Sequence, residues 1–326
     1  MLAHQKVAVV IPAHRAADTI EHVVRGLADF VDVIVVVDDA SPDRTAAVCA
    51  ALREPRLVLL SHDRNEGVGG AVVTGLRRAV EAGADIIAKI DADGQMDPAS
   101  LPDLLAPLLE RGFDYAKGNR FYDLKALAQM PWARRWGNVA LSFSTKLASG
   151  YWNIYDPQNG YVAIRREAFE RLDPDGLDRG YFFENSMLIQ LNIIGARVAD
   201  VPMPARYGEE RSSMRLGRVL LGFPPKLLRG WWMRMRLKYF GMDFSPIAVL
   251  LSAGACFTVA GISYGVYEWV LHARRGVATP AGTVMLAALP VLLGVQLLLN
   301  ALLLDIANTP PGDGIKRIAR REKRRP

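Results

Sequence analysis

The chain has 326 residues, about half of them hydrophobic, which is enough for one large soluble domain and a further part. Its net charge of +6 is unevenly placed, because residues 1–210 carry 23 Lys/Arg and 29 Asp/Glu whereas residues 211–326 carry 17 and 5. The positive excess belongs to the C-terminal part, which argues against nucleic-acid binding, and the two cysteines argue against a disulfide framework.

Near the N-terminus, apolar segments alternate with amphipathic ones. Apolar, β-branched segments predict strands at 6–14, 31–40, 56–62 and 85–90, and amphipathic segments predict helices at 18–30, 41–52 and 70–82. Near-continuous apolar strands that alternate with helices are typical of a parallel sheet covered on both faces. The sequence therefore predicts an α/β fold with a mostly parallel sheet.

Carboxylates follow two of these predicted strands. Asp38 and Asp39 come after the second strand, and Asp91 and Asp93 come after the fourth. Ligands of such sheets collect at the carboxyl ends of the strands. An Asp-x-Asp pair can hold Mg²⁺ or Mn²⁺ with phosphate oxygens, and an acid at a strand end can accept hydrogen bonds from a ribose or a base. Either cluster alone could equally be a helix cap or a solvated turn, but two clusters at one edge favour a nucleotide-diphosphate site.

A glycine-rich run, NEGVGGAVVTG, occupies residues 65–75. A dinucleotide-binding fingerprint needs G-x-G-x-x-G directly after the first strand, but this run follows the third and has Val72 where the last glycine should be. A nicotinamide dehydrogenase is therefore disfavoured. The glycines could still let the backbone approach a ligand or a neighbouring helix closely.

Beyond residue 100 the predicted pattern is mixed. We expect helices at 101–111, 132–150 and 181–195, strands at 115–121 and 196–203, and a turn and strand at 156–166. With the N-terminal elements, these complete a first domain over residues 1–210.

The C-terminal part has the composition of a membrane anchor. Residues 211–242 interleave tryptophans with basic residues, which predicts interfacial amphipathic helices on a lipid bilayer. No charged residue occurs at 245–267 or at 281–304, and each stretch exceeds the roughly 20 residues that cross a bilayer. We therefore predict a transmembrane hairpin within 243–309. Gly254, Gly261 and Gly265 could support close packing between protomers of a homo-oligomer.

Charge also predicts the orientation in the membrane. Basic residues crowd the segment before the first span and the tail 310–326, whereas the loop 268–280 has only Arg274 and Arg275. The positive-inside rule then puts both ends and the large domain in the cytoplasm. No signal peptide is expected, because His14, Arg15 and Asp18 interrupt the first apolar run. The sequence predicts a multi-pass protein of the inner (cytoplasmic) membrane.

Seven motifs, in this order and spacing, resemble those of family 2 glycosyltransferases with the GT-A fold: VAVVIPAH, VVVDDASPDRT, NEGVGGA, KIDADGQMDP, GNRF, DPQNGYVAIRR and YFFENSMLIQ. The DADGQ form and the hairpin resemble specifically the polyprenyl-phosphate (dolichol-phosphate-type) group. The resemblance implies a GT-A-type, Rossmann-like sheet and transfer of a sugar from a UDP- or GDP-sugar to polyprenyl phosphate, by metal-assisted displacement with inversion.

The resemblance also implies site residues. Asp91, Asp93 and Gln95 would hold Mg²⁺ or Mn²⁺ and the diphosphate, and Asp38 and Asp39 would contact the nucleoside near Pro12. The groups expected near the donor diphosphate and the lipid phosphate are Arg120, Arg135, Arg211 and Ser212. The catalytic role falls on Asp93, Arg120 and Arg135.

One departure and two alternatives accompany this interpretation. The family's first loop commonly reads Pro-x-Tyr-Asn-Glu, but Ala16 stands here in place of the acid, which leaves the base preference open. A first alternative is transfer to a hydroxyl of a lipid or polysaccharide with Glu184 as general base, although Asn185 follows it where such members usually have Asp. A second alternative is a non-catalytic membrane scaffold, which would be expected to lose the metal acids first.

Overall fold

A computed structural model describes residues 4–120, 132–203, 216–241 and 245–312. Contacts divide the chain into two compact units, one of residues 1–232 with 310–326 and one of residues 233–309. The first unit is called here the sheet unit and the second the hairpin unit.

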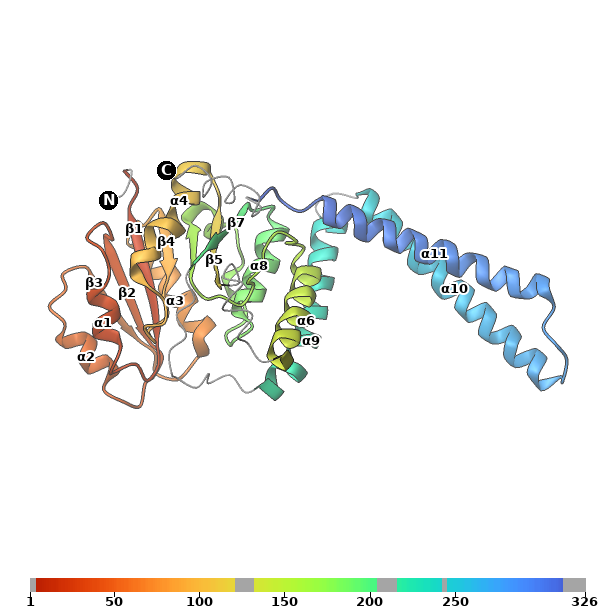
Figure 1. Ribbon diagram of the computed structural model, residues 1–326, viewed down its shortest axis with the longest axis horizontal. Coiled ribbons are helices and arrows are strands. Elements are labelled where there is room, and N and C mark those ends of the chain that lie inside the picture. Colours follow the sequence, from red (N-terminus) through yellow and green to blue (C-terminus); the bar gives the residue numbers. More distant parts are fainter. Residues whose placement is uncertain (1–3, 121–131, 204–215, 242–244, 313–326) are drawn as a thin grey trace. The chain divides into compact units, whose positions relative to one another are not determined.

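Within the described residues of the sheet unit, seven strands form one sheet in the order β3-β2-β1-β4-β6-β5-β7 (Figure 1). The bounds of the strands are β1 (Val7–Ala13), β2 (Val33–Asp38), β3 (Leu57–Ser61), β4 (Ile86–Lys89), β5 (Tyr115–Asn119), β6 (Val162–Arg165) and β7 (Val198–Pro202). All neighbours pair in parallel except β6, which runs antiparallel to both β4 and β5. The predicted mostly parallel α/β sheet is confirmed.

Alternate residues of the buried strands pack on opposite faces of the sheet. Val7, Val9 and Ile11 of β1 join one apolar core, and Ala8 and Val10 join the other. The helices that contribute to the first core are α1 (Ile20–Arg25), α2 (Thr45–Ala51) and α4 (Leu101–Arg111); those of the second are α3 (Gly67–Glu81), α7 (Arg166–Glu170) and α8 (Phe183–Ile193). Helix α6 (Trp132–Ser149) contacts α8, and η1 (Pro98–Ser100) and η3 (Pro174–Gly176) are short 3₁₀ turns.

Two of the predicted helices are shorter than expected. The helix predicted at 18–30 covers only 20–25, and the one predicted at 41–52 begins at Thr45. Polar side chains in the preceding loop cause the late start, because they bond across to the loop after β1. The Oγ of Ser41 accepts from the N–H of Arg15 at 3.1 Å, and an Asp43 oxygen accepts from the N–H of Ala17 at 3.3 Å. These side chains connect two loops, and the other oxygen of Asp43 accepts from the N–H of Thr45, where the helix begins.

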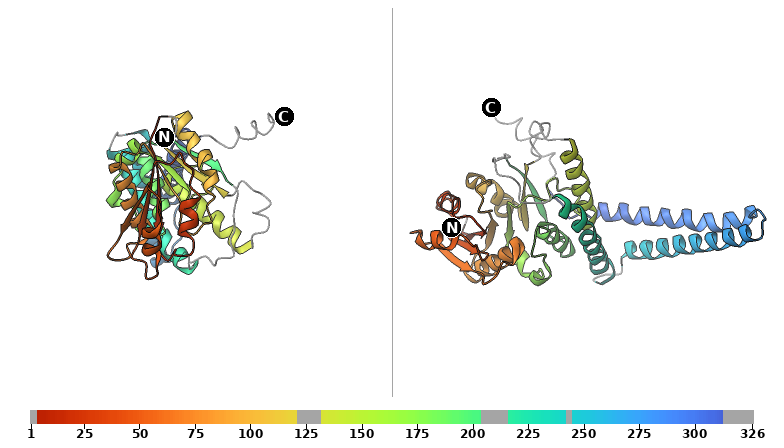
Figure 2. Two further views of the ribbon diagram at one scale, coloured as in Figure 1. Left: turned by 90° about the vertical axis from the view of Figure 1, so that its left-hand side faces the viewer. Right: turned by 90° about the horizontal axis from the view of Figure 1, so that it is seen from below.

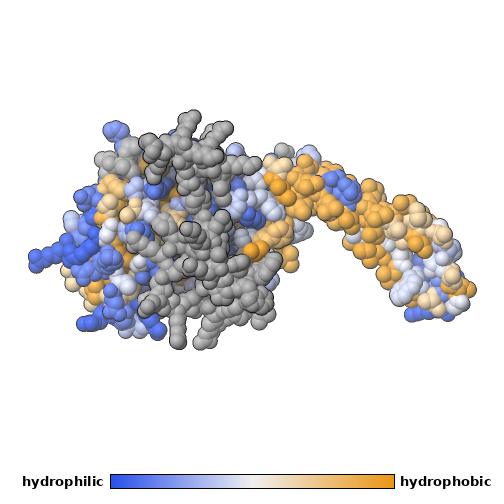
Figure 3. Space-filling view, viewed as in Figure 1, coloured by the Kyte–Doolittle hydropathy of each residue, from blue (hydrophilic) through white to orange (hydrophobic). Residues whose placement is uncertain are grey.

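The hairpin unit contains α10 (Pro246–Arg274) and α11 (Ala281–Ala307), which lie side by side (Figure 2, right). Both helices are long and apolar enough to cross a bilayer, and their surface is largely hydrophobic (Figure 3). A Cβ at Gly254 or Gly261 would lie within 3.0 Å of atoms of α11, and one at Gly265 would lie 3.1 Å from Ala287. These glycines therefore serve the close contact between the two helices of the hairpin, and the expected homo-oligomer stays a prediction.

A buried ion pair lies near the base of this hairpin. Helix α9 (Leu216–Met235) leads into a π-helical turn, η4 (Arg236–Gly241). The guanidinium of Arg234 donates to both oxygens of Asp305 at 2.7 and 2.9 Å, and the hydroxyl of Tyr239 donates to the same carboxylate. All three side chains are buried, so this bidentate contact fixes the last turn of α9 and η4 to α11.

Candidate active site

The sheet brings the two acid clusters to one edge, as the sequence predicts. Asp38 ends β2 and pairs in register with Ala13 at the end of β1, while Asp91 follows β4 on the other side of β1. The strands β1, β2 and β4 are parallel neighbours, so their carboxyl ends meet at this edge. Pro12, near the end of β1, lies between the two clusters.

A buried lysine connects Asp91 with Glu184. The ammonium of Lys89 lies 2.7 Å from an oxygen of Asp91 and 3.4 Å from an oxygen of Glu184, and its side chain is only 3% exposed. Burial disfavours the charge, but the two carboxylates outweigh burial and raise the pKa of Lys89 above its ordinary value. Sequence reasoning gave this lysine no role, although a lysine within the apolar strand IIAK was a visible signal.

Asp93 and Gln95 lie on the exposed turn after β4. One oxygen of Asp93 accepts from the N–H of Gln95 at 3.0 Å, and both side chains are exposed, while Asp91 is half-buried. Among the described residues, no cluster of three His, Cys, Asp or Glu side chains could enclose a metal. This donor set of two carboxylates and an amide nevertheless fits Mg²⁺ or Mn²⁺, because such ions commonly take one or two carboxylates and complete their shell with phosphate oxygens and water.

Gly160 makes the Lys89–Asp91 pair sterically possible. A Cβ at this position would lie 2.4 Å from the nitrogen of Lys89 and 2.8 Å from an oxygen of Asp91. We expect Gly160→Ala to displace the pair, to cost about 1 kcal/mol of stability and to raise the KM for the UDP- or GDP-sugar that the sequence resemblance implies. The KM and the melting temperature of purified variants would measure this. Gly222→Ala is the control, because a Cβ there meets nothing within 4 Å; equal KM values for the two variants would contradict the prediction.

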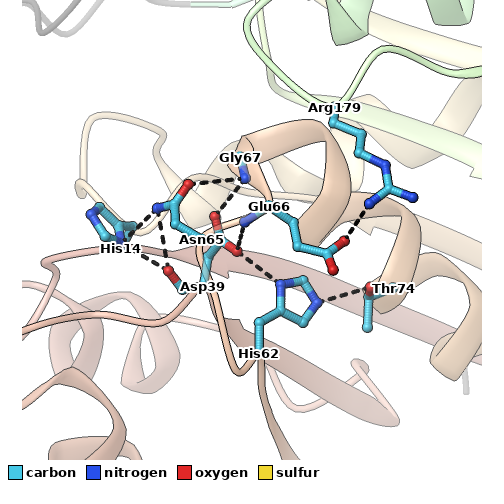
Figure 4. A network of polar contacts seen from close by, with 8 residues as sticks. All are labelled: His14, Asp39, His62, Asn65, Glu66, Gly67, Thr74 and Arg179. Atoms are coloured by element: carbon cyan, nitrogen blue, oxygen red, sulfur yellow. Dashed lines mark hydrogen bonds and ion pairs between the residues drawn. The ribbon is translucent and has the colours of Figure 1, made fainter.

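The neighbouring acid, Asp39, is occupied by bonds within the protein (Figure 4). One oxygen accepts from the N–H of Glu66 and contacts the ring of His62, both at 2.8 Å, and the other accepts from the N–H of Gly67 at 2.9 Å. The other ring nitrogen of His62 lies 3.0 Å from the hydroxyl of Thr74. Asp39 therefore fixes the glycine-rich loop to the end of β2.

Asp38 differs from Asp39 in its hydrogen bonding. Its side chain is 4% exposed, and its Oδ1 has no hydrogen-bond partner among the described residues. A buried carboxylate oxygen without a donor is costly in a folded protein, so this atom is suited to accept a hydrogen bond from a ligand.

The glycine-rich run receives a loop of the protein itself. The N–H groups of Gly69 and Gly70, at the start of α3, donate to the carbonyl of Arg179 at 2.7 and 3.2 Å. A Cβ at Gly69 would lie 2.1 Å from the carbonyl oxygen of Asp178, and the guanidinium of Arg179 pairs with Glu66 at 2.9 Å (Figure 4). The close approach left open by the sequence is thus an approach of backbone to backbone. The N–H groups of Gly69 and Gly70, which a dinucleotide fold would turn toward phosphate, are directed at a carbonyl here.

Arg120 stands at the carboxyl end of β5, where a buried acid orients it. Asp156, which is fully buried, accepts from the Nε of Arg120 at 2.7 Å and from its Nη2 at 3.1 Å. The side chain of Arg120 is 40% exposed, so part of it reaches solvent. A guanidinium held on one edge by a carboxylate is preorganised for an anion on its exposed part.

A second buried acid, Asp200 of β7, supports the same region. Its Oδ2 accepts from the amide of Asn119 at 2.6 Å, while its Oδ1 has no hydrogen-bond partner among the described residues. Burial raises the pKa of Asp200 to about 7, against the hydrogen bond from Asn119 and the N–H of Tyr155, which lower it. Asn119 directly precedes Arg120, so Asp200 supports the segment that carries Arg120, and the N–H of Arg120 also donates to Asp156 at 3.2 Å.

The structure describes only some of the remaining predicted site residues. Arg135 lies in helix α6, but its side chain is outside the described part, and Arg211 and Ser212 are outside the described residues. Glu184 is buried beside Lys89. Sequence reasoning missed Lys89, Asp156, Gly160 and Asp200; Asp156 and Gly160 lie in the quoted DPQNG motif, whereas nothing in the sequence distinguished Asp200.

The sequence is similar to those of known glycosyltransferases. A family model described as Glycosyl transferase family 2 matches residues 8–173. The UDP-N-acetylglucosamine–dolichyl-phosphate N-acetylglucosaminyltransferase of Methanococcus voltae is 31% identical over 237 residues, covering 68% of this chain and 94% of that protein. The undecaprenyl-phosphate mannosyltransferase of Micrococcus luteus is 30% identical over 203 residues, covering 61% of this chain and 82% of that protein.

Among solved structures, the glucosyl-3-phosphoglycerate synthase of Mycobacterium tuberculosis in complex with UDP shares the fold. Its TM-score is 0.53 at 23% identity, covering 71% of this chain and 80% of that chain. A second structure of that synthase, with Mn²⁺, UDP and glucosyl-3-phosphoglycerate, has a TM-score of 0.51. The two proteins therefore share the arrangement of the sheet.

Proposed function

The chain belongs to glycosyl transferase family 2, and from this premise we propose that it transfers a sugar from a UDP- or GDP-sugar to polyprenyl phosphate. One observation carries the proposal: Arg120, which buried Asp156 orients, lies at the same edge of the sheet as Asp91 and Asp93. Relatives named for dolichyl phosphate and undecaprenyl phosphate support the lipid acceptor.

In this proposal the acids of the sheet edge bind the donor. Asp38, whose Oδ1 has no partner among the described residues, accepts a hydrogen bond from the nucleoside beside Pro12, and Asp39 acts through the loop that it fixes. Asp91, Asp93 and Gln95 would hold Mg²⁺ or Mn²⁺, which neutralises charge on the diphosphate and makes it a better leaving group. Lys89 keeps the carboxylate of Asp91 in place through a contact of 2.7 Å.

The acceptor needs little activation by the protein. A phosphate monoester has a second pKa near 6, so polyprenyl phosphate is largely a dianion at cytoplasmic pH and needs no general base. Its phosphate oxygen forms a bond to the anomeric carbon while the bond from that carbon to the nucleoside diphosphate breaks, which inverts the anomeric centre. Arg120 orients the attacking phosphate, and Arg135, Arg211 and Ser212 are the further groups that we assign to it.

The contacts of Glu184 do not favour the hydroxyl-acceptor alternative. A general base must reach the proton that it removes. Glu184 is buried, and its carboxylate faces the ammonium of Lys89 at 3.4 Å, which suits a positioning role. A non-catalytic scaffold is also disfavoured, because the chain keeps both acids of the Asp-x-Asp pair and belongs to an enzyme family.

We also propose how the protein lies at the membrane. The spans α10 and α11 anchor it, and α9, with exposed Leu228 and Trp232, lies in the interface. The basic residues before the first span support a cytoplasmic location of the sheet unit. The active site then shares a side of the membrane with the cytoplasmic pool of sugar nucleotides.

Asp93→Ala tests the donor site. We expect it to lower the rate of transfer at least about 100-fold, because it removes a charge that stabilises the leaving diphosphate. The full chain in detergent would be incubated with undecaprenyl phosphate and a panel of UDP- and GDP-sugars, with and without EDTA. Asp103→Ala, which changes an exposed aspartate on α4, is the matched control.

Two results would contradict the proposal. Transfer that is indifferent to EDTA and to Asp93→Ala would exclude the metal assignment. Absence of a charged lipid product with every donor would exclude the acceptor assignment.

A further inference from the structure

A second lysine, Lys117 of β5, is buried near the active-site edge, and the proposed mechanism gives it no role. Its side chain is fully buried, and lysine is among the residues that proteins bury least. Lys89, Val162 and Lys117 lie opposite one another in the register of β4, β6 and β5. Residues that pair in this way point to the same face of a sheet, so both lysines lie on the face that α8 covers. The fold therefore places two buried ammonium groups two strands apart on one face.

The ammonium of Lys117 binds a turn of the protein, residues 156–160. It donates to the carbonyl of Asn159, and both residues are buried. The side-chain oxygen of Asn159 accepts from the N–H of Tyr161 at 3.0 Å. The N–H of Gly118, which follows Lys117, donates to the carbonyl of Tyr161 at 2.9 Å. Lys117 and Gly118 therefore fix the end of this turn to β5.

The same turn contacts both parts of the candidate site. At its start, Asp156 accepts two hydrogen bonds from the guanidinium of Arg120. At its end, Gly160 lies so close to the Lys89–Asp91 pair that a Cβ would collide with both side chains. The position of the turn therefore affects the arginine assigned to the acceptor phosphate and the acid assigned to the donor together.

We propose that Lys117 is a positioning residue, which holds the turn 156–160 so that the acceptor phosphate and the donor meet in line. The inference rests on the proposed function and adds to it a residue that acts through the turn, not by contact with a substrate. Displacement at the anomeric carbon needs the attacking oxygen opposite the leaving diphosphate, and a misplacement of about 1 Å can cost on the order of 100-fold in rate. Loss of Lys117 is therefore expected to affect the rate of transfer more than the affinity for either substrate.

The charge of Lys117 adds a dependence on pH. Charged groups on β4, β7, α8 and the segments beside the turn act on it: Lys89, Asp200, Glu184, Asp156 and Arg120. Burial lowers the pKa of Lys117 to about 8, although the carboxylates of Glu184 and Asp156 oppose this effect. A charged donor makes a stronger hydrogen bond than a neutral one. The bond to the carbonyl of Asn159 therefore weakens as the pH rises through about 8.

The test uses the full chain in detergent and three variants. Lys117→Met keeps the bulk of the side chain but removes the donor and the charge, and Lys117→Gln keeps an N–H donor without a titrating charge. Lys6→Met is the matched control, because Lys6 also donates to a backbone carbonyl, that of Ala82 at 2.6 Å, next to the amino end of β1. We would measure kcat and KM with undecaprenyl phosphate and UDP- or GDP-sugars from pH 7.5 to 9.5. Amide hydrogen exchange of the peptides that cover residues 156–161 needs no turnover and reports the turn itself.

We expect Lys117→Met to lower kcat about 10- to 100-fold and to change each KM by less than about threefold. Residues 156–161 should exchange faster in this variant, whereas Lys6→Met should match the unmodified chain in kcat and in exchange. The kcat of the unmodified chain should fall as the pH rises through about 8, and Lys117→Gln should lack this fall.

Equal kcat values for Lys117→Met and Lys6→Met would overturn the inference, even if the turn exchanged faster, because Lys117 would then have only a structural role. A kcat of the unmodified chain that stays constant from pH 7.5 to 9.5, or that falls in the same way in Lys117→Gln, would also overturn it. Faster exchange of the turn in Lys117→Met, together with no sugar transfer by the unmodified chain from any donor, has a different meaning. It would support the hold of Lys117 on the turn and overturn the proposed reaction.

Discussion

Replacing Lys89 with methionine is expected to lower the free energy of unfolding of the sheet unit by about 3–5 kcal/mol. The substitution keeps the volume of the side chain but removes the ammonium that contacts the carboxylates of both Asp91 and Glu184. Breaking a buried ion pair from one side costs much more than the pair itself contributes, because the remaining charge stays buried. Chemical unfolding of the full chain, followed by the signal of the sheet unit, would measure the loss.

Two further variants make this prediction specific. Adding Glu184→Gln to Lys89→Met should recover part of the lost stability, since it removes one uncompensated charge. Lys226→Met breaks an exposed pair with Asp178 and should change stability by no more than about 1 kcal/mol. If Lys89→Met unfolded at the same denaturant concentration as Lys226→Met, the contacts of Lys89 with Asp91 and Glu184 would not stabilise the sheet unit.

Asp200→Asn is expected to change how the stability of the sheet unit depends on pH. The pKa of Asp200 is about 7 in the folded protein, because burial outweighs the hydrogen bond from Asn119 and the nearby charge of Lys117, and because Asp156 repels a second negative charge. Between the ordinary value of 3.8 and about 7, the folded state holds a proton that the unfolded state has lost. The stability that protonated Asp200 contributes is therefore fully present below about pH 4 and is lost as the pH rises through about 7.

The amide that this substitution introduces would keep an acceptor for the side chain of Asn119 without the charge. At pH 8 we expect the variant to be more stable than the unmodified chain by about 2–4 kcal/mol, and at pH 5 the difference should shrink or change sign. Melting temperatures from pH 5 to pH 8.5 would measure this, with Asp175→Asn, which changes an exposed aspartate paired with Arg77, as control. Parallel pH profiles for the unmodified chain and Asp200→Asn would show that Asp200 does not titrate in this range.

The sequence predicted the sheet well because its strands are fully buried and nearly uninterrupted. Val7, Val9 and Ile11 on one face and Ala8 and Val10 on the other make a strand that is apolar at every position, which few other structures allow. The carboxyl edge with Asp38 and Asp91 followed directly from the parallel pairing. The antiparallel insertion of β6 between β4 and β5 could not be predicted, since strand order depends on contacts far apart in the chain.

The positioning groups were less predictable than the acids that they support. Lys89 stands out in an apolar strand, but its partner Glu184 lies 95 residues further along the chain. Asp39 and Asp38 are adjacent in sequence and equally acidic, yet only the structure shows that Asp39 is occupied by the N–H groups of Glu66 and Gly67. Short-range patterns indicate which groups carry charge; which of those charges is already compensated depends on the tertiary fold.

A soluble fragment of this protein would have to end before Arg234. The first apolar span begins near Ser245, and a cut placed there would keep Arg234 and Tyr239 while deleting Asp305, to which both are bonded. The fragment would then carry an arginine built for burial, beside the exposed apolar side chains of Leu237 and Phe240. For protein engineering, the boundary of the anchor lies about ten residues before its hydrophobic sequence begins.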